Sequence, residues 1–326
     1  MTSTHIHGTM RDRIVPCLLS ILSIILSTIL ARTPVDAEQP VRPLRVVTYN
    51  LLHDGAASGF FKGETNLEER LEMVIRELKV LDADIIAVQE ASDSRRHGNV
   101  PERLAHALGF HVVFAAATEH VFRLWPLDQA VVGIMGFREG PAILSRYPIT
   151  ASEAIDLTRC QRWIEPRMLL RAKVATEWGP LQIFSTHTAR GDECQMEQVG
   201  KIVRERGDSG LSLLMGDFNT PETSVVLTAL RNEAGFIDTY RMANPDEPGP
   251  TVWQRIDSEQ PTASRRVDFI FILPGGRTTA AVRSSRVVLN HPGHLPDGAA
   301  LWPSDHYGVL AEIDVIQPEG GSEPPQ

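Results

Sequence analysis

The hydrophobic residues of this chain fall mostly in short runs bounded by turn residues or polar side chains, a pattern typical of buried β-strands. Helical spacing of apolar residues is clearest over Leu67–Leu81 and weaker over Pro101–Leu108, Cys194–Glu205 and Ser224–Asn232. Strands outnumber helices and do not alternate with them, so the sequence predicts two packed sheets with helices outside. The predicted strands are Leu44–Tyr49, Ile85–Val88, Val112–Ala115, Val131–Gly136, Ala142–Ser145, Leu169–Ala175, Leu181–Thr186, Leu211–Met215, Val267–Leu273 and Gly308–Ile313.

The first 37 residues have the pattern of an export segment. Arg11 and Arg13 precede an uncharged apolar stretch over residues 14–30, and residues 35–37 (VDA) resemble a small-residue cleavage site. The apolar stretch is at the lower limit of length for crossing a bilayer. We therefore expect either a cleaved signal peptide, with a secreted or periplasmic protein, or an N-terminal membrane anchor formed by residues 14–30.

The rest of the chain is expected to form one domain. Residues 38–43 are predicted to be a linker, residues 44–316 the domain, and residues 317–326, rich in Pro, Gly and Glu, a disordered tail. Apolar residues make up 42% of the chain, enough for a sizeable core. The net charge of −9 gives no general attraction to nucleic acid or anionic membranes. Any polyanionic substrate would therefore need a local basic or metal-bearing cleft. We expect a monomer without an obligate protein partner.

Several predicted strands end on, or begin beside, polar residues of a restricted kind. Each alone is an ordinary turn residue or helix cap. Together they offer acid and amide oxygens, which suit Mg²⁺, Mn²⁺ or Ca²⁺, and two histidines with an acid that could orient one of them. Hydrolysis of a phosphate ester needs such a metal, a positioned water and hydrogen-bond donors. The residues are Asn50, Glu90, His187, Asp217, Asn219, Asp268, Asp305 and His306.

Seven stretches around these residues resemble the endonuclease/exonuclease/phosphatase superfamily, which includes pancreatic-type deoxyribonucleases, abasic-site endonucleases, neutral sphingomyelinases and inositol-polyphosphate 5-phosphatases. They stand in the family's order and span residues 44 to 313. The resemblance implies an α+β fold, a four-layer αββα sandwich of two mixed, mainly antiparallel sheets with helices on both outer faces. The stretches are VVTYNLL, ADIIAVQEA, GPAILSRYPI, FSTHT, LLMGDFNTP, RVDFIFI and SDHYGVLAEI.

The resemblance also implies which residues bind the metal and the phosphate. Asn50 and Glu90 match metal-site residues, and Asp305 is a candidate second metal ligand, with Mg²⁺ the expected cofactor and Mn²⁺ or Ca²⁺ the alternatives. His187 matches a histidine that donates to the scissile phosphate. Asn219 matches an amide that holds a phosphate oxygen and the attacking water.

The three remaining residues are implied to activate the water and stabilise charge. Asp217 matches the carboxylate that aligns or deprotonates the water, His306 a histidine at the phosphate, and Asp268 the partner that orients the His306 ring. The resemblance leaves open whether His306 or Asp217 is the base. Chemically, Asp268 would keep His306 protonated, which favours Asp217 as the base.

These roles predict an exported, metal-dependent phosphoesterase that hydrolyses a phosphodiester of nucleic acid or of a phospholipid headgroup by in-line attack of water. The alternatives are a phosphomonoesterase of the same fold and a catalytically silent binding module. Zinc bound by His291 and His294 is a weaker alternative, because no cysteine or third clustered histidine accompanies them. Glu139 is a candidate partner of His187, and Arg167 is expected either to face substrate or to cap a hairpin.

Two further expectations concern a hairpin and a loop. Pairing Glu177 with Pro180 across the hairpin of Leu169–Ala175 and Leu181–Thr186 brings Cys194 near Cys160, and in an exported protein this predicts a disulfide. Residues 290–303 precede the SDH motif directly. This loop is expected either to wall the substrate cleft or to plug the sheet edge with Trp302.

Overall fold

The computed structural model describes residues 1, 42–53, 66–157, 166–207, 210–275 and 278–316. The compact unit within it is Pro43–Gln326, and a separate unit is Met1–Arg42. The predicted export segment, the tail and most of the linker lie outside the described residues and stay predictions. No helix in the described part of the chain is long and apolar enough to cross a membrane.

The first β-sheet is built around the N-terminal strand β1, which runs parallel to β2 and antiparallel to β15. Its strand order is β12-β15-β1-β2-β5-β4, and the short β3 pairs with β2. The bounds are β1 Leu44–Asn50, β2 Ile85–Ser94, β3 Gly98–Asn99, β4 His111–Phe114, β5 Phe137–Ser145, β12 Thr279–Val288 and β15 Gly308–Ile316.

The second sheet has the order β10-β11-β9-β8-β7-β6, with β8 and β9 parallel and the other neighbours antiparallel. A two-stranded sheet of β13 (Gly293–His294) and β14 (Ala300–Leu301) lies in the loop before β15. The bounds are β6 Ile149–Asp156, β7 Met168–Thr176, β8 Gly179–His187, β9 Ser212–Asp217, β10 Ile237–Asp238 and β11 Asp268–Leu273.

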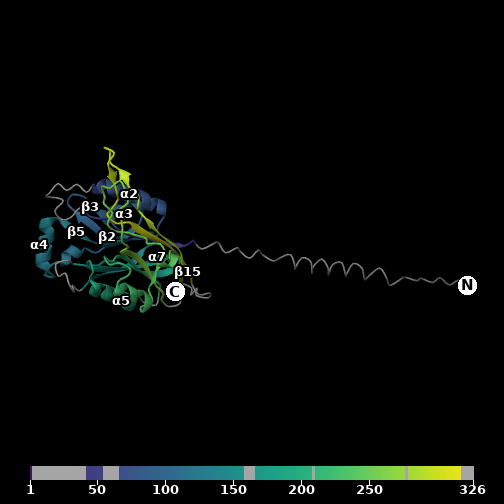
Figure 1. Ribbon diagram of the computed structural model, residues 1–326. Helices are drawn as coiled ribbons and strands as arrows, with labels where there is room; N and C mark the ends of the chain where they lie inside the picture. Colours follow the sequence, from purple (N-terminus) through teal and green to yellow (C-terminus); the bar gives the residue numbers. More distant parts are fainter. Residues whose placement is uncertain (2–41, 54–65, 158–165, 208–209, 276–277, 317–326) are drawn as a thin grey trace. The chain divides into compact units, whose positions relative to one another are not determined.

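Three hydrophobic layers hold the sheets and helices together. In Figure 1, α2 and α3 lie on one side of the strands and α5 on the other. One layer fills the space between the two sheets, another lies between the first sheet and helices α2 and α3, and the third lies between the second sheet and helices α5 and α6. The fold is therefore the expected four-layer αββα sandwich. The helices are α2 Leu67–Leu81, α3 Val100–Leu108, α4 Trp125–Met135, α5 Glu193–Arg206, α6 Val225–Asn232 and α7 Thr239–Ala243, with a 3₁₀ helix η1 at Ala117–His120.

The prediction of a strand at Val131–Gly136 was wrong, because this segment is the C-terminal half of α4 and its cap. Pro126 stands in the first turn, where its missing N–H costs nothing. Gly136 ends the helix in the left-handed conformation, with a φ of 59°, and donates its N–H to the Val132 carbonyl. The apolar run suggested burial in a sheet, but Ile134 and Met135 are exposed.

The hairpin register differs by two residues from the prediction. Pro180 pairs with Ala175 rather than with Glu177, and Gly179 pairs with Thr176. Glu177 and Trp178 therefore form a two-residue turn. Cys194 is disulfide-bonded in the structure, and its predicted partner Cys160 lies outside the described residues.

Candidate active site

Three of the predicted residues lie side by side across adjacent strands of the second sheet. His187, the last residue of β8, is the ladder partner of Asp217, the last residue of β9. Asp217 in turn pairs with Asp268, the first residue of β11. All three are nearly fully buried. The topology therefore brings residues that are up to 81 positions apart in sequence to one sheet edge.

The first sheet contributes Asn50 and Glu90 to the same edge. Asn50 ends β1, and its Nδ2 donates to Glu90 Oε1 at 3.2 Å and to Asp217 Oδ2 at 3.1 Å, so it bridges the two sheets. Glu90 lies where the pairing of β2 with β5 shifts register, and its φ is 50°. A bulge of this kind re-aims a side chain, which explains how Glu90 faces Asn50.

The glycine before Asp217 is required by a close approach of two strands. A Cβ atom at Gly216 would lie 2.0 Å from the carbonyl oxygen of Thr186 on β8. After the strand, the Asn219 N–H donates to Asp217 Oδ1 at 2.8 Å, and Asn219 has a left-handed φ of 49° that asparagine tolerates. The Gly-Asp-Phe-Asn turn therefore fixes both polar side chains at the sheet edge.

The carboxyl group of Asp217 is buried among other charged groups. Burial raises its pKa to about 7; the nearby charge of Asp268 acts in the same direction, whereas His306 and hydrogen bonds from Asn219 and Asn50 act against it. A carboxylate with a pKa near neutrality is well suited to accept a proton.

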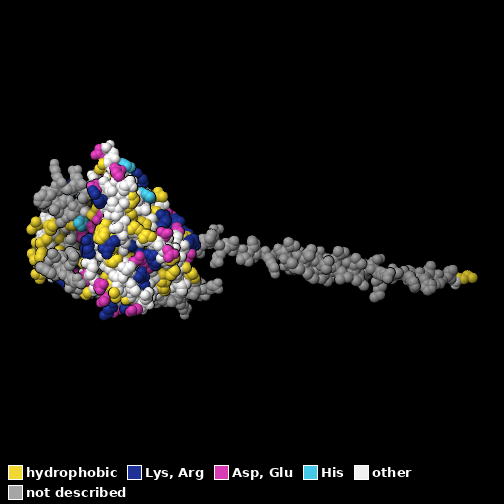
Figure 2. Space-filling view, in the orientation of Figure 1, with side chains coloured by type: hydrophobic (Ala, Val, Ile, Leu, Met, Phe, Trp, Pro, Cys, Tyr) yellow, Lys and Arg dark blue, Asp and Glu magenta, His cyan; other side chains and the backbone are white. Residues whose placement is uncertain are grey.

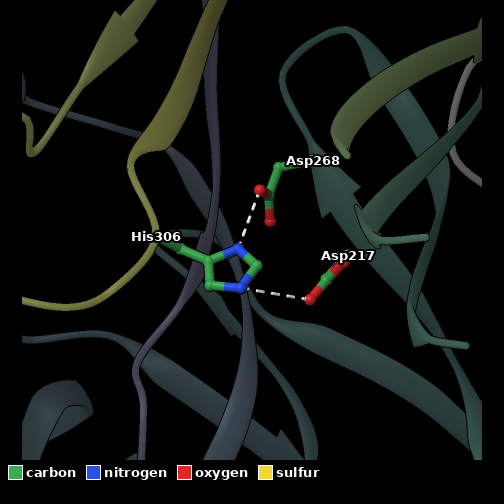
Figure 3. A group of neighbouring side chains, drawn as sticks. All are labelled: Asp217, Asp268 and His306. Atoms are coloured by element: carbon green, nitrogen blue, oxygen red, sulfur yellow. Dashed lines mark hydrogen bonds and ion pairs between the residues drawn. The ribbon is translucent and has the colours of Figure 1, made fainter. Parts of the chain in front are cut away.

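His306 is clamped between two carboxylates, as Figure 3 shows. Its Nδ1 lies 2.9 Å from Asp268 Oδ2, and its Nε2 lies 3.6 Å from Asp217 Oδ2. Burial alone lowers the pKa of His306, but the charges of Asp268 and Asp217 outweigh burial and raise it to about 10. The ring is therefore a cation at neutral pH, and the predicted pairing of Asp268 with His306 is present in the structure.

His187 has the opposite electrostatic environment. Arg167 Nη1 donates to its Nδ1 at 2.9 Å, and because a guanidinium group only donates, the proton of the neutral ring must be on Nε2. That Nε2 lies 3.4 Å from Asp217 Oδ2, which can accept its proton. It also lies 2.8 Å from Asn219 Nδ2, a nitrogen that donates to the Thr188 carbonyl and cannot accept from the ring. Burial and the charge of Arg167 lower the pKa of His187 well below its ordinary value. His187 is thus a neutral donor.

Two groups of acidic residues at this edge are candidates for a metal site. Asp217, Asp268 and His306 have ligand atoms within 4.8 Å of one another, but the His306 ring is protonated and cannot ligate a metal. The second candidate is Asp305 with Glu90. Burial raises the pKa of Asp305, and the negative charge of Glu90 raises it further. A hard divalent cation would relieve this repulsion, so Glu90 and Asp305 fit the predicted metal site. The oxygen of Asn50 accepts from the Leu52 N–H at 3.0 Å and has a second lone pair with which it could ligate the ion.

A cavity of about 310 Å³ opens beside these residues. Its polar lining includes His53, Glu139 and Arg167 as well as Glu90 and His187. The apolar lining comes mainly from α4, with Val121, Phe137 of β5 and Pro166. Sequence analysis gave His53 no role, although its N–H donates to Glu90 Oε2 at 3.4 Å. The run that follows Leu51 carries no distinctive motif, so only the fold brings His53 to the site.

The other candidates have structural surroundings. Trp302 is buried, stacks on Tyr307 and donates from Nε1 to the Ser258 carbonyl at 2.6 Å, and no residue of 290–303 lines the cavity. His291 and His294 belong to none of the metal-type clusters found among the described residues. Glu139 lines the cavity, and burial raises its pKa.

Comparisons with known proteins agree with this fold. The model of the Endonuclease/Exonuclease/phosphatase family matches residues 47–306, and a comparison with curated proteins found no match. A solved family protein from Bacteroides thetaiotaomicron superposes with a TM-score of 0.65 and 20% identity, covering 86% of this chain and 98% of that chain. The mannosyl-6-phosphatase of Bacteroides thetaiotaomicron VPI-5482 gives 0.64 and 21%, covering 83% and 99%. D. rerio TDP2, complexed with single strand DNA product, gives 0.59 and 17%, covering 83% and 98%.

Proposed function

Because the chain belongs to the endonuclease/exonuclease/phosphatase family, we propose that it is an exported, divalent-metal-dependent phosphoesterase that hydrolyses a phosphodiester. The observation that carries the proposal is the pair formed by Asp217 and His306. Their side chains lie 3.6 Å apart, one with a pKa of about 7 and the other with a pKa of about 10. Near pH 8 a base and a cationic donor are thus available at one point.

Asp217 is the general base in this proposal. Its Oδ2 accepts a hydrogen bond from Asn50 and faces His306, while its Oδ1 is held by the Asn219 N–H. A water in line with the scissile bond would lose its proton to Asp217 as its oxygen bonds to phosphorus. The opposite P–O bond breaks, and the departing alkoxide takes a proton from solvent. His306 stays protonated through Asp268 and would donate from Nε2 to the charge that develops on phosphate oxygens.

His187 and Asn219 are proposed to hold the phosphate itself. The Nε2–H of His187 is fixed as a donor by Arg167 behind the ring. Because His187 is neutral and His306 is cationic, the two histidines have different roles: His187 orients the phosphate and His306 stabilises the negative charge. Asn50, Glu90 and Asp305 would hold Mg²⁺, with Mn²⁺ or Ca²⁺ as alternatives. When bound, such an ion neutralises charge on the phosphate.

A diester carries two organic groups on phosphorus, and the cavity of about 310 Å³ offers room for one of them. The solved neighbours include a mannosyl-6-phosphatase and a protein complexed with a DNA strand, so both mono- and diesters belong in the test. We therefore propose to assay bis-p-nitrophenyl phosphate and p-nitrophenyl phosphate with Mg²⁺ and with a chelator. Faster Mg²⁺-dependent cleavage of the diester supports the proposal. Faster monoester cleavage favours the phosphomonoesterase, and silence on both favours a binding module.

Export is proposed on two observations. The basic and apolar pattern of residues 11–30 is that of an export segment, and Cys194 is disulfide-bonded, as oxidising compartments favour. N-terminal sequencing of the protein recovered from supernatant and membrane fractions tests it. A chain that begins near residue 38 indicates cleavage, an intact chain in the membrane fraction indicates an anchor, and an intact chain in the cytosol contradicts export.

A further inference from the structure

Helix α4 and the turn before it expose an unusual number of large apolar side chains. Trp125 is 76% exposed and Ile134 is 73% exposed. In Figure 2 apolar side chains gather at the left edge, where Figure 1 places α4. An isolated exposed apolar residue needs no explanation, but a group on one short element marks an interaction surface. The group, here called the α4 patch, consists of Phe122, Leu124, Trp125, Leu127, Ile134 and Met135.

The helix that carries the patch is fixed in place by polar contacts. Asp128 is the one buried residue of α4, and its carboxylate accepts hydrogen bonds from the N–H groups of Phe122 and Leu124 at 2.7 and 2.9 Å. Arg95 donates to the Gly133 carbonyl from the neighbouring turn. A helix that buries no apolar face normally carries a polar surface. In α4 the apolar side chains point outward instead, so the fold maintains their exposure.

The patch is also almost free of charge. Asp128 is the only charged residue in the sequence of α4, and it is buried. Arg123, at the N-terminal end, is ion-paired with Asp156 at 2.7 Å. Specific protein–protein interfaces have a polar rim with about one hydrogen bond per 100–200 Å², and α4 offers little to form one. The headgroup and acyl boundary of a lipid layer accepts apolar side chains and tryptophan without such bonds.

One side of α4 belongs to the catalytic cavity. Val131, Val132 and Met135 line it, with His187 and Glu90 among the other lining residues. Met135 belongs both to the cavity lining and to the patch. An apolar surface therefore runs from the phosphate site to the exposed face of α4. A small hydrated substrate has no apolar chain to pack on this surface. The apolar chain of an amphiphile could pack along it and be removed from water.

We propose that the α4 patch docks on a lipid surface and that the substrate is a phosphate ester of an amphiphile presented there; the substrate part rests on the proposed function. Of the two expected fates of residues 14–30, a retained anchor would also hold the domain at such a surface. The net charge of −9 gives no attraction to anionic headgroups. Docking is therefore by apolar insertion into a zwitterionic layer, and added salt leaves it unchanged.

Fluorescence quenching tests docking in the full chain. Phosphatidylcholine vesicles with brominated acyl chains quench only tryptophans that enter the layer. We expect quenching in the wild type that persists at high salt, is lost in Trp125→Phe and is kept in Trp253→Phe, which removes another exposed tryptophan. Because Trp125→Phe retains an aromatic ring, a loss of signal reports the position of residue 125 and not a loss of binding. Quenching that survives in Trp125→Phe, or none in the wild type, overturns the proposal.

Activity on two diesters tests the substrate class. The double variant Trp125→Ser with Ile134→Ser is compared with Val80→Ser with Val225→Ser, which also removes two exposed apolar side chains but lies on α2 and α6. On hexadecyl p-nitrophenyl phosphate in phosphatidylcholine vesicles, we expect the first variant to lose about tenfold or more and the second to match wild type. Ethyl p-nitrophenyl phosphate in solution should be cleaved equally by all three.

The outcomes separate this proposal from the proposed function. Quenching of Trp125 without cleavage of either diester leaves docking in place and contradicts the phosphoesterase. If the α4 variant cleaves the two diesters with the same loss of rate relative to wild type, or with no loss on either, the proposal of an amphiphilic substrate is contradicted. Light scattering measures the mass of the wild type and of the α4 variant. If the wild type is a dimer, the variant a monomer, and lipid quenches no tryptophan, then a second copy covers the patch and lipid docking is overturned.

Discussion

At the scale of single residues, the site depends on the different protonation states of its two histidines. His306 faces Asp268 and Asp217, and the pKa of its ring is raised to about 10. His187 receives a hydrogen bond from Arg167, and its pKa is lowered well below its ordinary value. One ring is therefore cationic and the other neutral at the same pH. Burial lowers the pKa of both rings; the charge of Arg167 lowers that of His187 further, whereas the charges of Asp268 and Asp217 outweigh burial at His306.

Asp268→Asn removes the charge that keeps His306 protonated. We expect turnover at pH 8 to fall by about 10²- to 10⁴-fold, the usual contribution of a positioned proton donor. The alkaline limb of the pH–rate profile should also move down from about 10. The profile of Asp257→Asn, which changes an exposed carboxylate paired with Arg255, serves as the control. An alkaline limb that does not move in Asp268→Asn would show that His306 is not held protonated by this contact.

Arg167→Met tests whether the guanidinium fixes the proton on Nε2 of His187. Without it, Nδ1 loses its donor and the ring can exchange tautomers. We expect activity to fall by about tenfold or more, as for a lost charge-assisted hydrogen bond, and the nitrogen NMR shifts of His187 to show mixed protonation. Arg171→Met, four residues further along on strand β7, removes a guanidinium that bonds Gln182 instead and should leave His187 unchanged. A wild-type NMR spectrum in Arg167→Met contradicts the assignment.

Sequence motifs identified the residues of the site but not all their partners. Asp217, Asn219 and His306 stand in short patterns that the sequence displays directly. The contact of Arg167 with His187 depends on where the chain enters β7, and His53 faces Glu90 only because the chain leaves β1 at the same edge. The sequence left Arg167 either to face substrate or to cap a hairpin, and it gave no signal for His53, so spacing in sequence could not assign these contacts.

At the scale of elements, prediction succeeded where one face of an element is buried. Helix α2 buries Leu67, Leu71, Val74 and Leu78 on one side, so its period is visible. It failed for elements at the margin of the fold. Strands β6 and β12 stand at sheet edges with many exposed positions, and α4 exposes the apolar run that was predicted as a strand. Hydrophobicity normally indicates burial, but in α4 the apolar side chains are exposed.

Gly216→Ala tests the close approach of β8 and β9. The added Cβ would meet the Thr186 carbonyl oxygen at 2.0 Å, so a strand must shift, which costs about 1–3 kcal/mol. Gly133→Ala, in α4, is the matched control: its Cβ meets nothing within 4 Å, and alanine in a helix should stabilise by about 0.5–1 kcal/mol. Urea denaturation measures both. Equal effects of the two substitutions would mean that the approach of the strands is not tight.

At the scale of the whole molecule, the strand pattern predicted two packed sheets with helices outside, and the resemblance of the seven stretches implied the four-layer sandwich. The sequence could not specify the register of the β7–β8 hairpin. The two-residue turn at Glu177 and Trp178 shifts the pairing by two positions from the prediction. Turn geometry fixes hairpin register, and these two residues do not belong to the common turn signals. The site is therefore predictable as a set of strand ends but not as a set of contacts.

The buried charges should also make the stability of the fold depend on pH. The pKa of His306 is raised from 6.5 to about 10, so its contribution is fully present below 6.5 and is lost as the pH rises through about 10. One such group changes the free energy of unfolding by at most about 1.4 kcal/mol per pH unit. We expect denaturation experiments to show this decline between pH 7 and 10 and His306→Gln to flatten it. A decline of the same slope in His306→Gln would assign it to other groups.

The most direct test of the account is the rate of bis-p-nitrophenyl phosphate hydrolysis by the wild type and by Asp217→Asn, measured from pH 5 to 10 with Mg²⁺. Asp217 has a pKa of about 7 and is assigned as the base. We predict that the wild-type rate rises through about pH 7, is lost when a chelator is added, and falls by about 10²-fold or more in Asp217→Asn. Wild-type activity in Asp217→Asn would contradict the assignment of Asp217 as the base. Cleavage that continues with the chelator would contradict the metal dependence.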